Sequence, residues 1–154
     1  TVPMGAVFVR DGIYDAFMNA APENAIEFFH GYTYSGHPLA CAAGIATLDV
    51  YRNDDLFARA AELAPYFESA LHSLSDVNNV IDVRNLGMMG AIELESIPGK
   101  PTFRAMDAFQ KAFDAGLLIR TTGDTIALSP PLIIEKKQVD FIADTVRTVL
   151  NTVH

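Results

Sequence analysis

The segment HGYTYSGHPLACAAGIATL, residues 30–48, is the most informative stretch of the chain. Its first half consists of glycine and hydroxyl residues, and its second half opens at Pro38 with an alanine-rich sequence that predicts a helix. Proline suits a first helical turn because its missing N–H would have no partner there anyway. Such a loop ahead of a helix offers N–H groups, hydroxyls and a positive dipole end, which together suit an anion or a phosphate. The same pattern also occurs where a tight loop simply enters a helix.

Composition narrows the class of protein. Half of the 154 residues are apolar and 19% are charged, which indicates a sizeable core. The net charge of −8 argues against a nucleic-acid surface, which needs clustered Lys and Arg. No apolar run approaches the roughly 20 residues that cross a bilayer, so we expect no membrane partner. Cys41 is the only cysteine, which fits a reducing compartment, and the expected location is the cytoplasm.

The apolar run at Gly5–Val9 predicts a buried strand of a parallel α/β sheet. Natural termini are usually polar and frayed. A chain that starts at Thr1 and enters a core strand at once is therefore expected to be the downstream part of something longer.

Hydrophobic spacing and turn residues predict the remaining elements. In the first part of the chain they are a short helix around Ile13–Met18 and a short strand at Ala25–Phe29. A helix follows over Leu56–Leu74, which Asn53–Asp55 caps and Pro65 kinks or breaks, and then an antiparallel hairpin or two adjacent strands at Val80–Leu86 and Ala91–Glu95. The last elements are a helix that Thr102 caps and that ends before Gly116, short strands at Leu117–Arg120 and Thr125–Leu128, and a helix with an apolar stripe over Val139–Val153.

The chain thus has two parts. Residues 1–52 resemble the tail of a larger α/β sheet, and residues 53–154 resemble a compact α+β unit with its own core. The expected fold class is α/β.

Several reactive-looking patterns have simpler interpretations. Ser35-Gly36-His37 lacks the glycine two residues before the serine that a nucleophile elbow needs. The four histidines and the lone cysteine show no metal-ligand spacing, so we expect no metal. None of the four lysines lies in an apolar setting that would lower its pKa, so all four are interpreted as surface charges.

Arg120 ends the apolar segment LLIR and is a candidate ligand for a carboxylate. An arginine at a strand end is either paired with an acid or grips a ligand carboxylate with two hydrogen bonds, and the pattern leaves both open. Arg84 lies close to Asp82, which favours a structural role.

Four segments together resemble the class III pyridoxal-phosphate (PLP)-dependent aminotransferases. They are VPMGAV (2–7), HGYTYSGHPLACAAGIATLDVY (30–51), RNLGMMGAIELE (84–95) and LLIRTTGDTIALSPPLII (117–134), in the family's order. The form TYSGHP resembles the omega-amino acid or beta-alanine–pyruvate transaminase branch. The resemblance implies the C-terminal portion of a fold type I PLP-dependent transferase: the end of the large mixed-sheet domain at 1–52 and the small α+β domain at 53–154.

The resemblance also assigns roles. Thr33 matches the threonine that binds the cofactor phosphate from the neighbouring subunit of a homodimer, and Tyr32 matches the aromatic position beside phosphate and substrate. Arg120 matches the mobile arginine that clamps the substrate carboxylate or swings away for amines. PLP would pass an amino group from an amino acid or amine to a keto acid such as pyruvate.

In the family, the Schiff-base lysine lies a few residues before the segment that matches TVPMGAV. No catalytic residue is therefore expected in this chain, and the isolated chain is expected not to transaminate. Two alternatives remain open: a stand-alone non-catalytic binding or assembly domain, and a catalytically dead paralogue.

Overall fold

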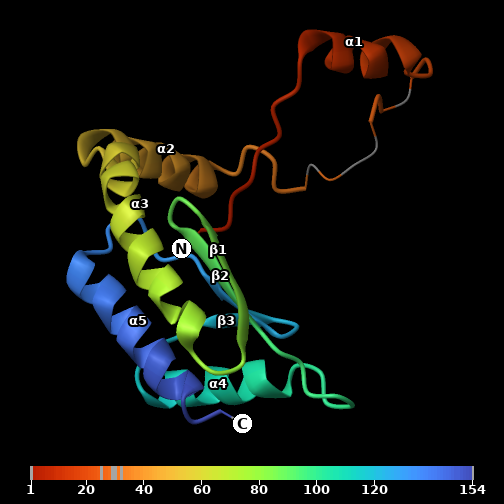
Figure 1. Cartoon of the computed structure of the whole chain (residues 1–154). Coiled ribbons are helices and arrows are strands. Elements are labelled where there is room, and N and C mark those ends of the chain that lie inside the picture. Colours follow the sequence, from red (N-terminus) through yellow and green to blue (C-terminus); the bar gives the residue numbers. More distant parts are fainter. Residues whose placement is uncertain (1, 25, 29–30, 32, 154) are drawn as a thin grey trace. The chain divides into compact units, whose positions relative to one another are not determined.

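The computed structural model describes residues 2–24, 26–28, 31 and 33–153. The chain divides into two compact units, Thr1–Asp54 and Asp55–His154 (Figure 1). Within the described part, no helix is both long enough and apolar enough to span a bilayer.

The first unit contains two helices, α1 (Asp11–Ala20) and α2 (Pro38–Asn53). Pro38 occupies the first turn of α2, as its chemistry predicts. His37 is the N-cap, and its Nδ1 accepts a hydrogen bond from the backbone N–H of Ala40 at 3.4 Å. The short helix expected around Ile13–Met18 and the helix expected from Pro38 are thus confirmed.

The buried strand expected at Gly5–Val9 is wrong. These residues form no strand and are exposed, with Phe8 95% exposed. A strand needs a neighbour for its backbone N–H and C=O groups, and the described residues of this unit supply none. Residues 26–28 also form no strand, while Ala25 and Phe29 lie outside the described residues.

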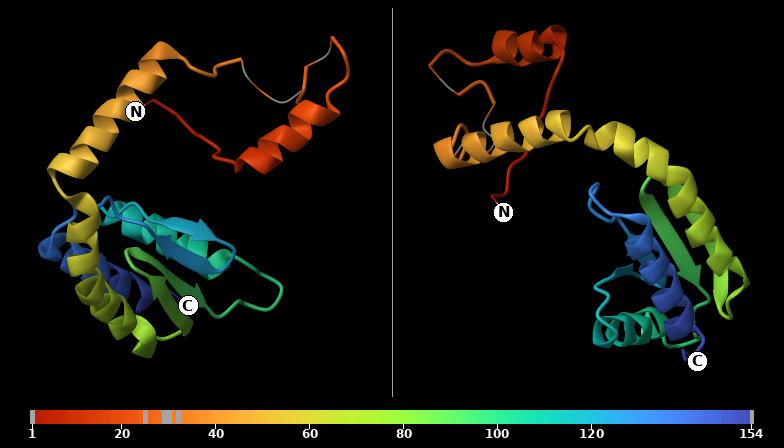
Figure 2. Two further views of the ribbon diagram at one scale, coloured as in Figure 1. Left: turned by 90° about the horizontal axis from the view of Figure 1, so that it is seen from above. Right: turned by 90° about the vertical axis from the view of Figure 1, so that its left-hand side faces the viewer.

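The second unit is an antiparallel four-stranded sheet covered by helices on one face (Figures 1 and 2). Its strands have the spatial order β1-β2-β4-β3. The elements are α3 (Leu56–His72), a short 3₁₀ turn (Ser73–Asp76), β1 (Val80–Leu86), β2 (Met89–Leu94), α4 (Phe103–Asp114), β3 (Arg120–Thr122), β4 (Thr125–Leu128) and α5 (Lys136–Leu150). The paired strands predicted around the 87–90 turn are confirmed.

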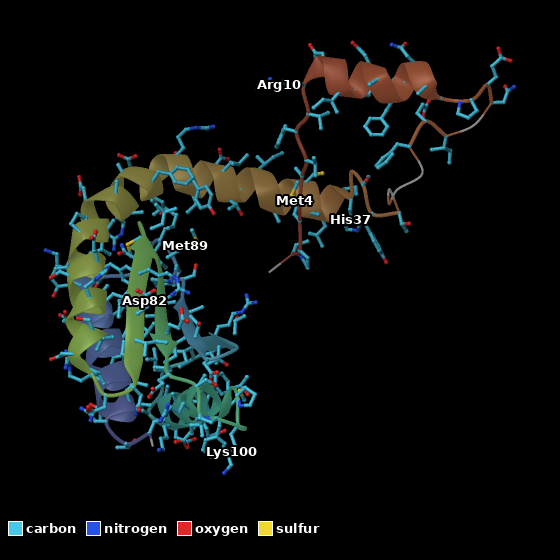
Figure 3. The ribbon with its side chains drawn as sticks, turned by 45° about the vertical axis from the view of Figure 1, so that its right-hand side comes forward. Met4, Arg10, His37, Asp82, Met89 and Lys100 are labelled. Carbon is cyan, nitrogen blue, oxygen red and sulfur yellow. The ribbon has the colours of Figure 1, made fainter. Side chains whose placement is uncertain are left out.

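The hairpin of β1 and β2 turns at Gly87, whose φ of +56° suits glycine. Met89 opens β2 beyond this turn (Figure 3). The pairing runs in register from Leu86↔Met89 back to Asp82↔Glu93, and a bulge follows between Asp82 and Val80.

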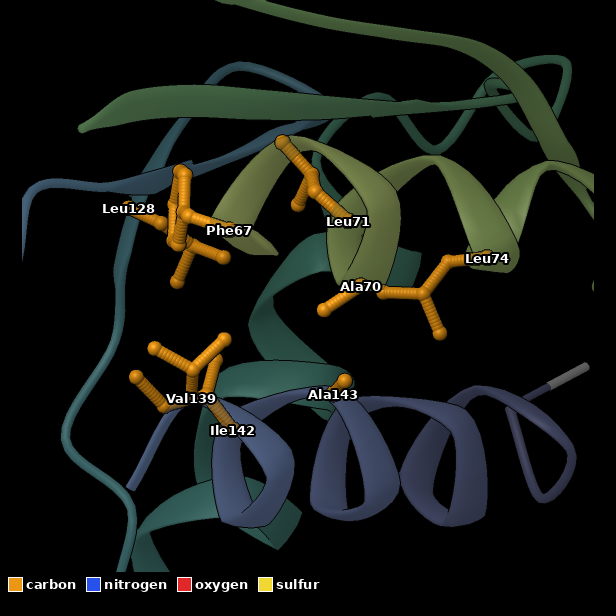
Figure 4. A pocket seen from close by; sticks show the side chains of 8 residues that line it. All are labelled: Phe67, Ala70, Leu71, Leu74, Leu128, Val139, Ile142 and Ala143. Atoms are coloured by element: carbon orange, nitrogen blue, oxygen red, sulfur yellow. The ribbon is translucent and has the colours of Figure 1, made fainter. Parts of the chain in front are cut away.

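Alternate residues of β2 and β4 supply the sheet side of the core. Ile92, Leu94, Ile126 and Leu128 are buried, while the residues between them are more exposed. The helices contribute Phe67 and Leu71 from α3, Ala105, Ala108 and Ala112 from α4, and Val139, Val146 and Leu150 from α5. A cavity of about 10 Å³ lies between α3 and α5, with Leu128 also in its wall (Figure 4).

Gly90 allows α3 to approach β2 closely. A Cβ at this position would lie 2.4 Å from Cδ2 of Leu71 and 3.2 Å from Cε1 of Phe67. Both side chains are buried, with exposed fractions of 3% and 1%. Close packing of helix on sheet therefore accounts for the glycine in RNLGMMG.

Local expectations for the helices are met only in part. α3 runs through Pro65 without a break, and a kink at this residue stays a prediction. Asp55 and Thr102 occupy N-cap positions, but neither side chain makes a capping hydrogen bond. Both have a positive φ, 47° for Asp55 and 68° for Thr102, instead of the extended backbone from which an N-cap side chain reaches back to the helix.

Candidate functional site

The loop before α2 exposes hydroxyl groups at the start of a helix. Residues 33–36 form turns, and the N–H of His37 donates to the carbonyl of Tyr34 at 3.2 Å. Gly36 has a φ of +68°, which suits glycine. The side chains of Thr33 and Ser35 are exposed, and the first turn of α2 has no acidic residue. The arrangement can accept an anion, because the exposed hydroxyls can donate to it and the helix dipole favours negative charge there.

Thr33 lies in this exposed turn, within the first unit. Tyr32, the second residue expected to bind the cofactor, lies outside the described residues. Arg120 belongs to the second unit, whereas Thr33 belongs to the first.

Arg120 opens a strand instead of ending one. The strand expected at Leu117–Arg120 is displaced, because the chain turns at Gly123 and Asp124 and pairs Thr122 with Thr125. That turn sets the register, so β3 covers Arg120–Thr122. Of the preceding apolar residues, Ile119 joins the core with 5% exposure.

The strand register places Arg120 on the face of the sheet away from the helices. Thr121 pairs with the buried Ile126, and its hydroxyl donates to Sδ of Met106 on α4 at 3.7 Å. Because side chains alternate along a strand, the side chain of Arg120 leaves from the opposite, open face. There it is part of a row across all four strands: Arg84, Ala91, Ala127 and Arg120.

The two arginines in this row differ in their partners. Arg84 donates to a carboxylate oxygen of Asp82 on its own strand and to one of Glu93 on β2, the latter at 2.7 Å (Figure 3 labels Asp82). These hydrogen bonds, that of Asp82 first, raise the pKa of Arg84. Among the described residues, the guanidinium of Arg120 has no hydrogen bond or ion pair. Arg120 is thus the cation of the row whose charge is uncompensated, and the structural role predicted for Arg84 agrees with its two ion pairs.

Arg120 also borders an open groove of about 890 Å³ within the second unit. Most of the wall is apolar and comes from the segment before β3, the segment 129–134 and the start of α5. The polar lining includes Glu135 and Lys137, which form an ion pair at 2.8 Å. This pairing lowers the pKa of Glu135 and raises that of Lys137. The pair is internally neutral, so Arg120 gives the groove its net positive charge.

The other cations and ligand-type residues form no second centre in the described part of the chain. No group of three or more His, Cys, Asp or Glu side chains is arranged to hold a metal ion there. Lys111 pairs with Asp107 at 2.8 Å. Lys100 lies over the ring of Phe103, and Lys136 lies over that of Tyr66.

Sequence reasoning missed two parts of this region. One is Glu93, which neutralises Arg84 across the hairpin; the alternation of polar and apolar residues in AIELE is the signal that could have placed it on the open face. The other is the ion pair of Glu135 and Lys137 at the groove, which depends on how α5 begins and has no sequence signature.

Comparison with known proteins identifies the family. The family model "Aminotransferase class-III" matches residues 2–150. The chain is 61% identical over 152 residues to an omega-aminotransferase of Caulobacter vibrioides and 48% identical over 151 residues to a beta-alanine–pyruvate aminotransferase of Pseudomonas aeruginosa. These alignments cover 99% and 97% of this chain but 34% of each relative. The chain therefore spans about a third of the length of these curated relatives.

Solved structures agree. An amine transaminase from an uncultivated Pseudomonas species, in its PLP-bound form, has a TM-score of 0.78 at 31% identity, covering 94% of this chain and 34% of that one. An adenosylmethionine-8-amino-7-oxononanoate aminotransferase of Methanocaldococcus jannaschii has a TM-score of 0.77 at 27% identity, covering 93% of this chain and 34% of that one. The expected fold, the C-terminal portion of a fold type I PLP-dependent transferase, is confirmed, as is the resemblance read from the four sequence segments. The chain belongs to the class III aminotransferase family.

Proposed function

We propose that the protein carrying this chain is an omega-transaminase that transfers the amino group of an omega-amino acid or amine to pyruvate or a similar keto acid. The observation that carries the proposal is the uncompensated guanidinium of Arg120 on the open sheet face, beside a largely apolar groove. The names of the relatives from C. vibrioides and P. aeruginosa support the same substrate class.

The charge balance of the groove favours substrates with one carboxylate. Arg120 can hold a carboxylate with two parallel hydrogen bonds. Glu135 and Lys137 neutralise each other, so they offer no second site for an anion. Beta-alanine and pyruvate each carry one carboxylate, whereas a dicarboxylic keto acid would leave its second charge against apolar groove residues, at an energetic cost.

The loop before α2 fits the phosphate of PLP, the cofactor of this family. Thr33 and Ser35 present exposed hydroxyls beside the N-terminus of α2, and no carboxylate in the first turn opposes an anion. In the proposal, Thr33 donates its hydroxyl and backbone N–H to the phosphate, and Tyr32 lies beside phosphate and substrate. When bound, PLP supplies the electron sink for amino-group transfer.

No lysine of this chain fits the role of covalent anchor for PLP. Such a lysine needs a lowered pKa. The ion pair between Lys137 and Glu135 instead raises the pKa of Lys137. Lys111 is held by Asp107 and by the carbonyl of Thr152, and the other two lysines each lie over an aromatic ring. We therefore infer that the anchoring lysine belongs to another stretch of the protein, and that the 154-residue chain alone is inactive.

The assembly in this proposal is a homodimer in which Thr33 reaches the cofactor of the neighbouring subunit. Residues 1–52 would end the large domain and residues 53–154 would form the small one; the division of the chain after Asp54 supports this assignment. The single cysteine supports a reducing, cytoplasmic location.

Arg120→Gln in the intact enzyme tests the proposal, with Arg84→Gln as the matched control from the same row of the sheet. The assay is the half-reaction with the amino donor alone, so that the carboxylate of the keto acid does not contribute. Loss of a charged hydrogen-bond pair should raise the half-saturation concentration for beta-alanine by about 10- to 100-fold. The half-saturation concentration for a simple alkylamine should change by less than about twofold. Equal losses for both donors, or the same loss in Arg84→Gln, would contradict the role of Arg120.

A further inference from the structure

Asp124 connects the turn between β3 and β4 to two other elements. Its carboxylate oxygen Oδ1 accepts the backbone N–H of Thr102, directly before α4, at 2.8 Å. Its backbone carbonyl accepts the N–H of Leu94, at the end of β2, at 2.9 Å. One half-buried residue thus ties the turn to the start of α4 through its side chain and to the sheet through its backbone.

The strand that carries Arg120 depends on this turn for its register. β3 has three paired residues, and it lies at the edge of the sheet, where β4 alone pairs with it. A slip of one residue moves every side chain of a strand to the other face. Arg120 would then face α4, in the place that Thr121 now occupies against Met106.

The backbone conformation of Thr102 indicates that its contact with Asp124 is a defined part of the structure. Its φ of +68° is a left-handed conformation that a threonine adopts at a cost. Such a conformation persists where surrounding contacts determine it, and the hydrogen bond to Asp124 is one such contact. The carboxylate also lies at the N-terminus of α4, where the helix dipole favours negative charge.

We propose that Asp124 is a positioning residue for Arg120: its carboxylate fastens the β3–β4 turn to α4 and so keeps the guanidinium on the open face beside the groove. The inference rests on the proposed role of Arg120 in binding the substrate carboxylate. Asp124 itself touches no substrate. It raises the fraction of molecules in which Arg120 is correctly placed, and apparent affinity scales with that fraction.

The test uses three variants of the intact enzyme. Asp124→Ala removes the side-chain bond to Thr102 and keeps the backbone bond to Leu94, so the sheet should still form. Asp124→Asn keeps an oxygen acceptor and should rescue part of the effect. Asp76→Ala is the matched control, because it removes a surface carboxylate that pairs with Arg147 at 3.0 Å and links the 3₁₀ turn to α5.

Two readouts are measured. Hydrogen exchange followed by mass spectrometry should show protection of residues 120–127 falling by about tenfold in Asp124→Ala, in line with the loss of one charge-assisted hydrogen bond. The half-saturation for beta-alanine should rise about three- to tenfold while kcat and the half-saturation for an alkylamine stay within about twofold. Asp76→Ala should change neither readout.

The outcomes separate this inference from the function on which it rests. If Arg120→Gln discriminates between the two donors but Asp124→Ala neither loosens residues 120–127 nor changes the half-saturation for beta-alanine, Asp124 has no positioning role and the proposed function stands. If Arg120→Gln fails to discriminate between the two donors, the proposed function falls. Unchanged hydrogen exchange in Asp124→Ala would separately overturn the claim that the carboxylate of Asp124 fastens the β3–β4 turn to α4. Equal weakening toward both donors in Asp124→Ala would indicate a general structural defect and would also overturn the inference.

Discussion

Gly90→Ala tests whether close packing of α3 on β2 holds the second unit together. The added Cβ would lie 2.4 Å from Cδ2 of Leu71, whereas carbon atoms pack favourably at about 3.5–4.0 Å. Leu71 must therefore withdraw by about 1 Å. The ring of Phe67 must move a few tenths of an ångström, because its Cε1 and Cζ atoms lie 3.2 and 3.3 Å from the new atom.

The neighbouring cavity relieves this overlap only in part. It is lined by both Phe67 and Leu71, but its volume of about 10 Å³ is close to that of one water-sized probe. Overpacking of a well-packed core costs about 1–3 kcal/mol. Replacing a strand glycine by alanine otherwise gains about 0.5–1 kcal/mol. The expected net loss is about 1–2 kcal/mol, which lowers the Tm of a unit of this size by about 5–15 °C.

Thermal unfolding followed by circular dichroism measures this loss. The control Gly12→Ala adds a Cβ in α1 that meets no atom within 4 Å, so it should leave the Tm unchanged or slightly higher. The double variant Gly90→Ala/Leu71→Ala removes the clashing methyl groups and should be less destabilised than the sum of its two single variants, by about 1 kcal/mol. A wild-type Tm for Gly90→Ala, or strict additivity in the double variant, would refute the packing argument.

Three further predictions concern cofactor and charge. Incubation of the chain with PLP and reduction with borohydride should leave no stoichiometric adduct on any of the four lysines by mass spectrometry; a stoichiometric adduct would overturn the inference that the anchor lies elsewhere. Thr33→Ala in the intact enzyme should weaken PLP retention about tenfold, and unchanged affinity would remove Thr33 from the phosphate site. The hydroxyl of Tyr66 donates to Asp140 at 2.5 Å, and this bond raises the pKa of Tyr66. Its stabilising contribution is therefore fully present below the unfolded pKa of about 10 and is lost as pH rises through the higher folded value. The difference in urea midpoint between wild type and Tyr66→Phe should shrink above about pH 10, and a difference that persists unchanged through the alkaline range would contradict the assignment.

Local signals predicted much of the fold. Pro38 marked the start of α2, and Gly87 marked the turn of the first hairpin. These residues act through their own backbone preferences, so their effect is visible in the sequence. The same reasoning failed at Gly5–Val9, because an apolar run becomes a strand only beside another strand, and pairing is not a local property.

The candidate site, too, has features that local sequence predicts and features that depend on distant residues. The residue type of Arg120 and its place near a strand were readable from LLIR, and the segments around it carried the family resemblance. The face that it occupies depends on the register of four strands, and the two carboxylates on that face, Asp82 and Glu93, pair with Arg84. Such tertiary pairings have no counterpart in linear spacing. The roles of Thr33 and Tyr32 stay predictions.

The bulge and the charges of β1 bear on how the second unit behaves in solution. β1 is an outer strand of the sheet, and its free backbone groups could pair with those of another molecule. The extra residue at Ile81 interrupts the regular backbone spacing, and Asp82 and Arg84 place charges along the strand. Both features discourage strand-to-strand association between molecules. Replacing the two charged residues with uncharged β-branched residues should therefore make β1 prone to pair with the same strand of another molecule and to aggregate.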